Sequence, residues 1–174
     1  GIWDGVEVWG DRTLPQNNSV QGVYLLYNTT IVNAQMGIFF DKRPLINAKI
    51  QPLSGGIVRA NNSTFINNYL AVKMRSYPDF TSISYFKNCT FEYSSSSPYE
   101  YISGPKMEFI NLFDYHGLKI QGCHFINTTP NDFAIQDRGW GIKSTDASYI
   151  VDELCINCQQ FPPITQPTIS ENLS

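Results

Sequence analysis

Two short segments of this 174-residue chain carry side chains of the kinds that cleave polysaccharides. They are Asp114 with His116, and Asp137-Arg138 followed by Lys143 and Asp146. Hydrolysis of a glycosidic bond uses two carboxyl groups that flank it, and elimination by a lyase would use a Lys or Arg base beside acidic ligands of a calcium ion. The sequence has no adjacent Asp pair and no Gly-His-Gly signature. Asp114, His116 and Arg138 are therefore the catalytic candidates, against the simpler interpretation that Asp114 and Asp137 cap turns.

A second group of residues could bind a sugar without cleaving it. If the chain forms strands as its repeats indicate, these aromatic and cationic side chains point outward: Arg59, Tyr85, Lys87, Lys119 and Lys143. Aromatic rings can stack on sugars, and cations can pair with uronic acids and sulfates. The alternative is an ordinary solvated sheet with scattered apolar residues.

Both groups of candidates depend on an internal repeat. Residues 22–40 match residues 56–74 without a gap, and the middle of this unit recurs at 86–91 and 120–125. The identical pairs of the first match are Gly22/Gly56, Asn28/Asn62, Thr30/Thr64 and Asn33/Asn67. Self-similarity at a period of about 20 to 50 residues indicates a solenoid, in which each coil buries its apolar face only by stacking on its neighbours.

Each repeat unit has the pattern of short β-segments interrupted at Asn or Gly. Alternation of period two turns one face of each segment inward, and Asn or Gly at the bends tolerates a left-handed backbone. Third strands are expected at 36–40, 70–74 and 140–144, with a similar segment at 3–8. The fold class is therefore all-β, a right-handed parallel β-helix of about four to five coils with loop insertions.

Stacking of the coils predicts columns of like residues. Two inner columns should be apolar, one should hold small residues, and an Asn column should form a buried amide ladder at the bend. The columns are Leu26/Ala60/Phe86/Ile120, Ile31/Phe65/Phe91/Phe125, Thr29/Ser63/Cys89/Cys123 and Asn28/Asn62/Asn88. Insertions between coils are expected at 11–20, 41–53, 94–106 and 129–138.

The four cysteines fall into two pairs. Cys89 and Cys123 share one inner column, where neighbouring coils bring Cα atoms within disulfide range, so a disulfide and two stacked free thiols both fit. Cys155 and Cys158 form a CxxC that fits a local disulfide, half of a metal site or a redox pair. A zinc site would need a second CxxC or a His pair, and thioredoxin-type chemistry would need a βαβ context. We therefore predict a disulfide for Cys155 and Cys158, and no metal site.

Composition and chain ends indicate the setting of the protein. The formal charge of −3 is too small to favour nucleic acid or an acidic membrane surface, and charged residues are only 16% of the chain. No apolar run approaches the ~18 residues of a membrane helix. The chain begins inside a predicted strand, so we expect residues 1–158 to be a β-helix domain from a longer solenoid and the Pro-containing residues 159–174 to be an extended tail or linker.

Several structural motifs together resemble a known group of proteins. They are Trp3-x-Gly-Val-x-Val8, Gly22-Val…Asn28-x-Thr-Ile31, Gly55-Gly-Ile-Val58, Tyr85-Phe-x-Asn-Cys-Thr-Phe91 and Gly139-x-Gly-Ile-Lys-Ser144. From about Trp3 to Cys158 the chain resembles the right-handed parallel β-helix regions of large secreted or surface proteins of Bacteroidetes, many of which carry a C-terminal sorting domain for type IX secretion. The resemblance implies an extracellular or cell-surface location and carries over no catalytic residue. The sorting domain itself is not in this sequence.

These observations favour a non-catalytic, secreted or cell-surface scaffold that binds a polysaccharide or surface glycan, or mediates adhesion. We expect no cofactor, no nucleic acid and no membrane insertion. The second hypothesis is a polysaccharide lyase or glycosidase, with calcium as the added ion of a lyase. The third is a structural spacer or filament subunit that self-associates through its coil ends.

Overall fold

The computed structural model describes residues 1–40, 53–94, 96–98, 107–128 and 139–153, and every regular element within them is a β-strand. In chain order these are β1 Val6–Glu7, β2 Val23–Tyr27, β3 Thr30–Val32, β4 Met36–Phe39, β5 Ile57–Asn61, β6 Thr64–Ile66, β7 Leu70–Met74, β8 Tyr85–Lys87, β9 Thr90–Tyr93, β10 Glu108–Phe113, β11 His116–Gln121, β12 His124–Asn127, β13 Trp140–Thr145 and β14 Ser148–Asp152. None of the described residues lies in a helix that could span a bilayer.

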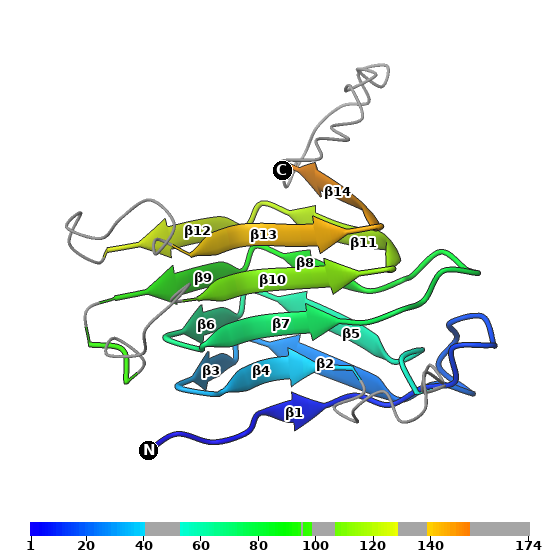
Figure 1. Ribbon diagram of the computed structural model, residues 1–174, viewed down its shortest axis with the longest axis horizontal. Coiled ribbons are helices and arrows are strands. Elements are labelled where there is room, and N and C mark those ends of the chain that lie inside the picture. The colour runs from blue at the N-terminus through cyan, green and yellow to red at the C-terminus, as the bar shows by residue number, and fades with distance from the viewer. Residues whose placement is uncertain (41–52, 95, 99–106, 129–138, 154–174) are drawn as a thin grey trace.

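The strands form three parallel sheets around one core (Figure 1). Sheet A has the order β1-β4-β7-β10-β13, sheet B the order β14-β11-β8-β5-β2, and sheet C the order β12-β9-β6-β3. Each strand pairs with the third strand before or after it in the sequence, so the chain circles the core once between paired strands. This arrangement is the parallel β-helix that the repeat predicts.

The predicted inner columns are confirmed by the strand register. Leu26, Ala60, Phe86 and Ile120 are consecutive partners in sheet B, and Ile31, Phe65, Phe91 and Phe125 are consecutive partners in sheet C. The rings of Phe65 and Phe91 stack with centroids 4.7 Å apart, and those of Phe91 and Phe125 stack at 5.1 Å. Each such pair contributes about 0.5–1.5 kcal/mol beyond the burial of its area. The coils are therefore joined by a continuous aromatic stack as well as by backbone hydrogen bonds.

Left-handed residues form the corners between sheets, as predicted. Asn28, Asn62 and Asn88 have φ values of 50°, 48° and 49°, and Gly122 continues this corner with φ 59°. An amide rung is present between Asn88 Nδ2, which donates, and Asn62 Oδ1 at 2.7 Å. The expectation of a buried ladder is wrong, because all three Asn side chains are exposed. Asn occupies this corner because of its backbone conformation, and the amide bond is a surface addition to it.

The sequence patterns missed two strands, β10 and β14. β10 continues sheet A, where Ile110 and Leu112 lie beside Val72 and Met74. Its coil has the repeat motif at Asn88-Cys-Thr90, but the insertion at 94–106 separates β10 from that corner, whereas β4 and β7 follow Asn28 and Asn62 after the same short interval. Asp114 and Asp146, with φ values of 50° and 48°, form the left-handed corner that leads from sheet A into β11 and β14, and neither belongs to an Asn-x-Thr motif.

The inner column of small residues is present, and it contains the cysteine pair Cys89 and Cys123. Thr29 N bonds Ser63 Oγ at 3.3 Å, and the backbone of His124 bonds Cys89 O at 2.9 Å, so the column continues from coil to coil. Cys89 and Cys123 are free thiols. Of the two alternatives, the structure has the stacked free thiols and no disulfide, and each thiol donates to a backbone carbonyl, Cys89 to that of Lys87 and Cys123 to that of Phe86.

The two thiols differ in acidity. The pKa of Cys89 is raised, first by its hydrogen bond with Cys123 and then by burial, whereas the pKa of Cys123 is lowered by the same hydrogen bond. Cys155, Cys158 and the predicted tail at 159–174 lie outside the described residues.

Candidate functional site

Sheet B carries the predicted outward row. Arg59 pairs in register with Tyr85, and Tyr85 pairs with Lys119. Leu25 and Ile150 continue the row at its two ends, and both are more than half exposed, at 52% and 54%. Neighbouring strands of a sheet are about 4.8 Å apart, so the row runs along the axis of the β-helix with one side chain per coil.

A second row lies beside the first, two residues further along each strand. Its members are Tyr27, Asn61, Lys87, Gln121 and Asp152. The Lys87 ammonium lies 4.7 Å from the centroid of the Tyr85 ring, and Asn61 Nδ2 donates to the Tyr85 hydroxyl at 3.3 Å. Tyr85 is thus held by a cation at its ring and by an amide at its hydroxyl. Both contacts reduce the rotamer freedom that this ring would lose on binding a ligand.

The charge of this surface is largely uncompensated. Arg59, Lys87 and Lys119 make no ion pair with any carboxylate of the described residues, and Asp152 lies at the far end of the second row. Three cations spaced along one axis favour a ligand that carries several negative charges at regular intervals. Four of the five predicted ligand-binding residues, Arg59, Tyr85, Lys87 and Lys119, are therefore brought together here.

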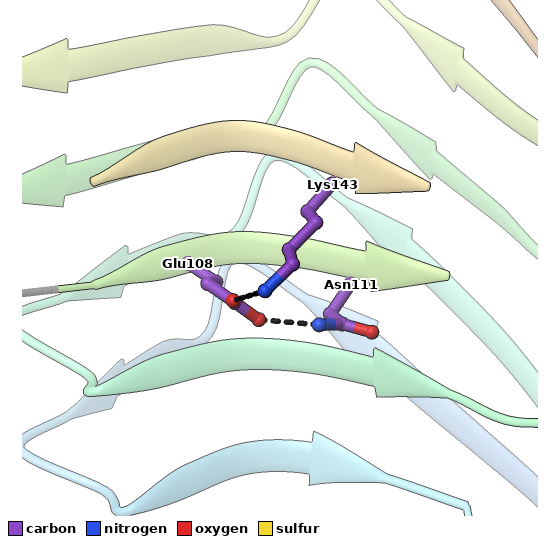
Figure 2. Close-up of polar contacts among 3 residues, drawn as sticks. All are labelled: Glu108, Asn111 and Lys143. Carbon is purple, nitrogen blue, oxygen red and sulfur yellow. Dashed lines mark hydrogen bonds and ion pairs between the residues drawn. The ribbon is translucent and has the colours of Figure 1, made fainter. Parts of the chain in front are cut away.

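Lys143, the fifth candidate, lies on sheet A instead. Figure 2 shows its side chain reaching from β13 over β10, where its ammonium lies 2.7 Å from Glu108 Oε1. The other carboxylate oxygen of Glu108 accepts a hydrogen bond from Asn111 Nδ2. Lys143 Nζ is also 6.0 Å from the centroid of the Trp140 ring. This cluster combines an aromatic ring, a carboxylate, an amide and an ammonium on one outer face.

Glu108 and Asn111 were missed because β10 was missed. A short signal for them exists in the sequence: Ile110-Asn111 has the same apolar-polar order as Val72-Lys73 and Ile142-Lys143, with which it pairs in register. The insertion at 94–106 separates this segment from the Asn88 corner, and two matching residues are too few to establish its register.

The catalytic candidates have structural partners. Asp114 is a left-handed corner residue whose Oδ2 accepts from Ser76 Oγ at 2.5 Å, and Ser76 Oγ in turn accepts from Arg12 Nη1 at 3.0 Å. His116 Nδ1 is 3.0 Å from Ser148 Oγ of the next coil. Asp114 thus joins its corner to the segment after β7. Asp137 and Arg138 lie outside the described residues.

A network of buried polar side chains lies where the chain enters the strands of sheet B. The hydroxyl of Tyr115 is 2.6 Å from Ser82 Oγ and donates to Ser84 Oγ at 3.1 Å, and Gln16 Nε2 donates to it at 3.4 Å. Burial raises the pKa of Tyr115, and these hydrogen bonds act in the opposite direction. The network fastens the segments at 11–20 and 75–84 to the coils, and its side chains are buried. Its role is structural.

The described residues contain no group of three or more His, Cys, Asp or Glu side chains that could hold a metal ion. Comparison with known proteins assigns no family, because no protein-family model, no curated protein and no solved structure matches this chain. The outer faces of sheets A and B are therefore the candidate binding surfaces.

Proposed function

We propose that this protein is a non-catalytic, extracellular β-helical scaffold that binds an extended polyanionic glycan along the outer face of sheet B. The observation that carries the proposal is the row of Arg59, Tyr85 and Lys119, which repeats one side chain per coil beside Lys87. A linear polymer of uronic acids or sulfated sugars matches such a row, because its charges and its ring faces also repeat along one direction. The low content of charged residues and the resemblance to secreted and surface β-helices support the location.

Each cation of the row would make charge-assisted hydrogen bonds to a carboxylate or sulfate, and each such bond contributes about 1.5–3 kcal/mol. Tyr85 would stack on one sugar ring between two cations. Because the cations are at the surface, salt should weaken binding.

The test is binding of the purified chain to immobilised polygalacturonate, to a sulfated polysaccharide and to neutral dextran, with and without calcium. Lys119→Ala and Arg59→Ala should each weaken binding to the charged polymer about tenfold, the equivalent of roughly 1.4 kcal/mol. Thr64→Ala, on the outer face of sheet C, is the matched control and should bind as wild type does. Binding that does not change in the two sheet B variants would reject this face as the site.

Product release is followed in the same experiment, because it separates the scaffold from an enzyme. Formation of unsaturated sugars or of new reducing ends would replace the proposal with the lyase or glycosidase hypothesis. Equal binding to dextran and to the charged polymers would show that charge does not select the ligand, and would also reject it.

A further inference from the structure

The outer face of sheet A carries a second set of polar and aromatic side chains, distinct from the row on sheet B. The register places Leu70, Glu108 and Trp140 side by side on β7, β10 and β13. The same three strands place Lys73, Asn111 and Lys143 side by side three residues further on. The term Trp140 cluster denotes Lys73, Glu108, Asn111, Trp140 and Lys143.

The contacts within the Trp140 cluster hold its members in place and leave ligand-binding atoms free. Glu108 uses one carboxylate oxygen for Lys143 and the other for Asn111 (Figure 2). Only 18% of the Glu108 side chain is exposed, against 46% of the Lys143 side chain. The ammonium of Lys143 retains two further N–H donors, and the Asn111 carbonyl oxygen can still accept a hydrogen bond. Glu108 therefore positions two groups that face solvent, rather than facing a ligand itself.

The charge of the Trp140 cluster calls for an anion. Lys73 is half-buried and makes no ion pair with the described residues. Burial lowers the pKa of Lys73, the nearby Arg75 lowers it further, and Glu108 only partly opposes them. Glu108 thus pairs with Lys143 and is also the only carboxylate of the described residues that acts appreciably on Lys73. A bound anion would offset the desolvation of Lys73, which Glu108 opposes only in part.

Trp140 adds a large ring beside these cations. Its side chain is 44% exposed although it lies within a strand, and the ammonium of Lys143 is 6.0 Å from the ring centroid. Exposed aromatic rings beside a few convergent polar groups are typical of small-molecule sites. The apolar face of a pyranose ring is suited to the indole face, and an inorganic anion has no such face.

We propose that the Trp140 cluster binds a single carboxylated sugar, with the ring of the sugar on Trp140 and its carboxylate toward Lys143 and Lys73. The ligand proposed for sheet B is a polymer, whereas this ligand is one sugar residue, either free or at the end of a glycan chain. Asn111 would accept a hydrogen bond from a ring hydroxyl. The site is separate from sheet B, so that either can be present without the other.

The test uses the full chain labelled with ¹⁵N and follows the indole N–H signals of its three tryptophans. Trp140→Phe assigns the Trp140 signal by its disappearance. Glucuronate should shift this signal to saturation in the millimolar range, whereas glucose and acetate at equal concentration should shift it at least tenfold less. No saturable shift with glucuronate would overturn the proposal. If acetate shifted the signal as much as glucuronate does, the proposed stacking of a sugar ring on Trp140 would be rejected. If glucose shifted it as much, the proposed role of the carboxylate would be rejected.

Variants separate this site from that of sheet B. Lys73→Met should weaken glucuronate binding at least fivefold, and Lys73→Arg should restore most of it, while the remaining spectrum reports that the fold is intact. Lys119→Met, on sheet B, should leave the glucuronate response unchanged although it weakens binding of the charged polymer. An equal loss in Lys73→Met and Lys119→Met would show a diffuse charge effect and would overturn a site at Trp140. Wild-type binding in Lys73→Met would also overturn it.

Discussion

Replacement of Asn62 by Val tests why asparagine forms the corner between β5 and β6. Asn62 has φ 48°, its side chain is exposed, and its Oδ1 accepts from Asn88 Nδ2 at 2.7 Å. A β-branched residue is disfavoured in this left-handed conformation, at a cost of about 1–3 kcal/mol. The exposed amide bond adds about 0.5 kcal/mol. We therefore expect Asn62→Val to lower the free energy of unfolding by about 2–3 kcal/mol.

Replacement of the same residue by Gly separates the backbone from the amide. Asn62→Gly loses the amide bond as Val does, but Gly adopts positive φ without strain and adds only the entropy of a freer unfolded chain, about 0.5–1 kcal/mol. The expected loss is therefore about 1 kcal/mol, well below that of Val. If an amide ladder were the main reason for Asn at this corner, Gly and Val would be equally damaging.

The assay is urea unfolding followed by circular dichroism, with the loss taken from the shift in midpoint at an unchanged slope. Thr64→Val, a substitution on the outer face of the adjoining strand β6, serves as the matched control and should change stability by less than about 0.5 kcal/mol. Equal losses in Asn62→Val and Asn62→Gly would refute the backbone argument, and so would a stable Asn62→Val.

Two further predictions concern the interior. Phe65 is 1% exposed; its ring stacks on Phe91 with centroids 4.7 Å apart and meets the edge of Phe86 with centroids 5.8 Å apart. Phe65→Ala should therefore lower the free energy of unfolding in urea by about 3–5 kcal/mol. A loss below about 1.5 kcal/mol would contradict tight packing of this column. Tyr115→Phe should cost about 1–3 kcal/mol at pH 7, because it leaves the hydroxyls of Ser82 and Ser84 with one partner fewer. Burial raises the pKa of Tyr115 above that of the unfolded chain, so its phenol stabilises the fold fully below about pH 10 and progressively less above it. The difference in unfolding midpoint between wild type and Tyr115→Phe should therefore narrow from pH 9 to pH 11, and a constant difference would contradict the assignment.

The coils marked by Asn-x-Thr could be predicted in detail from the sequence. The residues Asn28, Asn62 and Asn88 specify both the position of the bend and the inward residue that follows, because a left-handed corner interrupts the alternation at one place in each coil. Once three corners are aligned, it is known which residues of each strand point inward and which point outward. The inner columns through Phe86 and Phe91 follow from this. The outward row of Arg59, Tyr85 and Lys119 came from the same alignment.

The interactions on sheet A could not be predicted in this way. Glu108 meets Lys143 and Asn111 only because β10 lies between β7 and β13, and β10 follows a stretch that carries no repeat motif. The partly buried contact of Asp114 with Ser76 joins segments from different coils for a similar reason. Its partner lies between β7 and β8, in a segment that the repeat pattern did not predict.

Local backbone chemistry is thus what the sequence by itself determined: the left-handed Asn corners, the period-two strands and, through them, the stacked columns of a parallel β-helix. Each of these depends on residues within one coil, repeated. Only the tertiary structure decided which coil supplies β10, that Cys89 and Cys123 remain thiols, and which charged side chains meet across strands. These features depend on contacts between residues about 30 or more positions apart, whose register is set by packing of whole coils rather than by any local pattern.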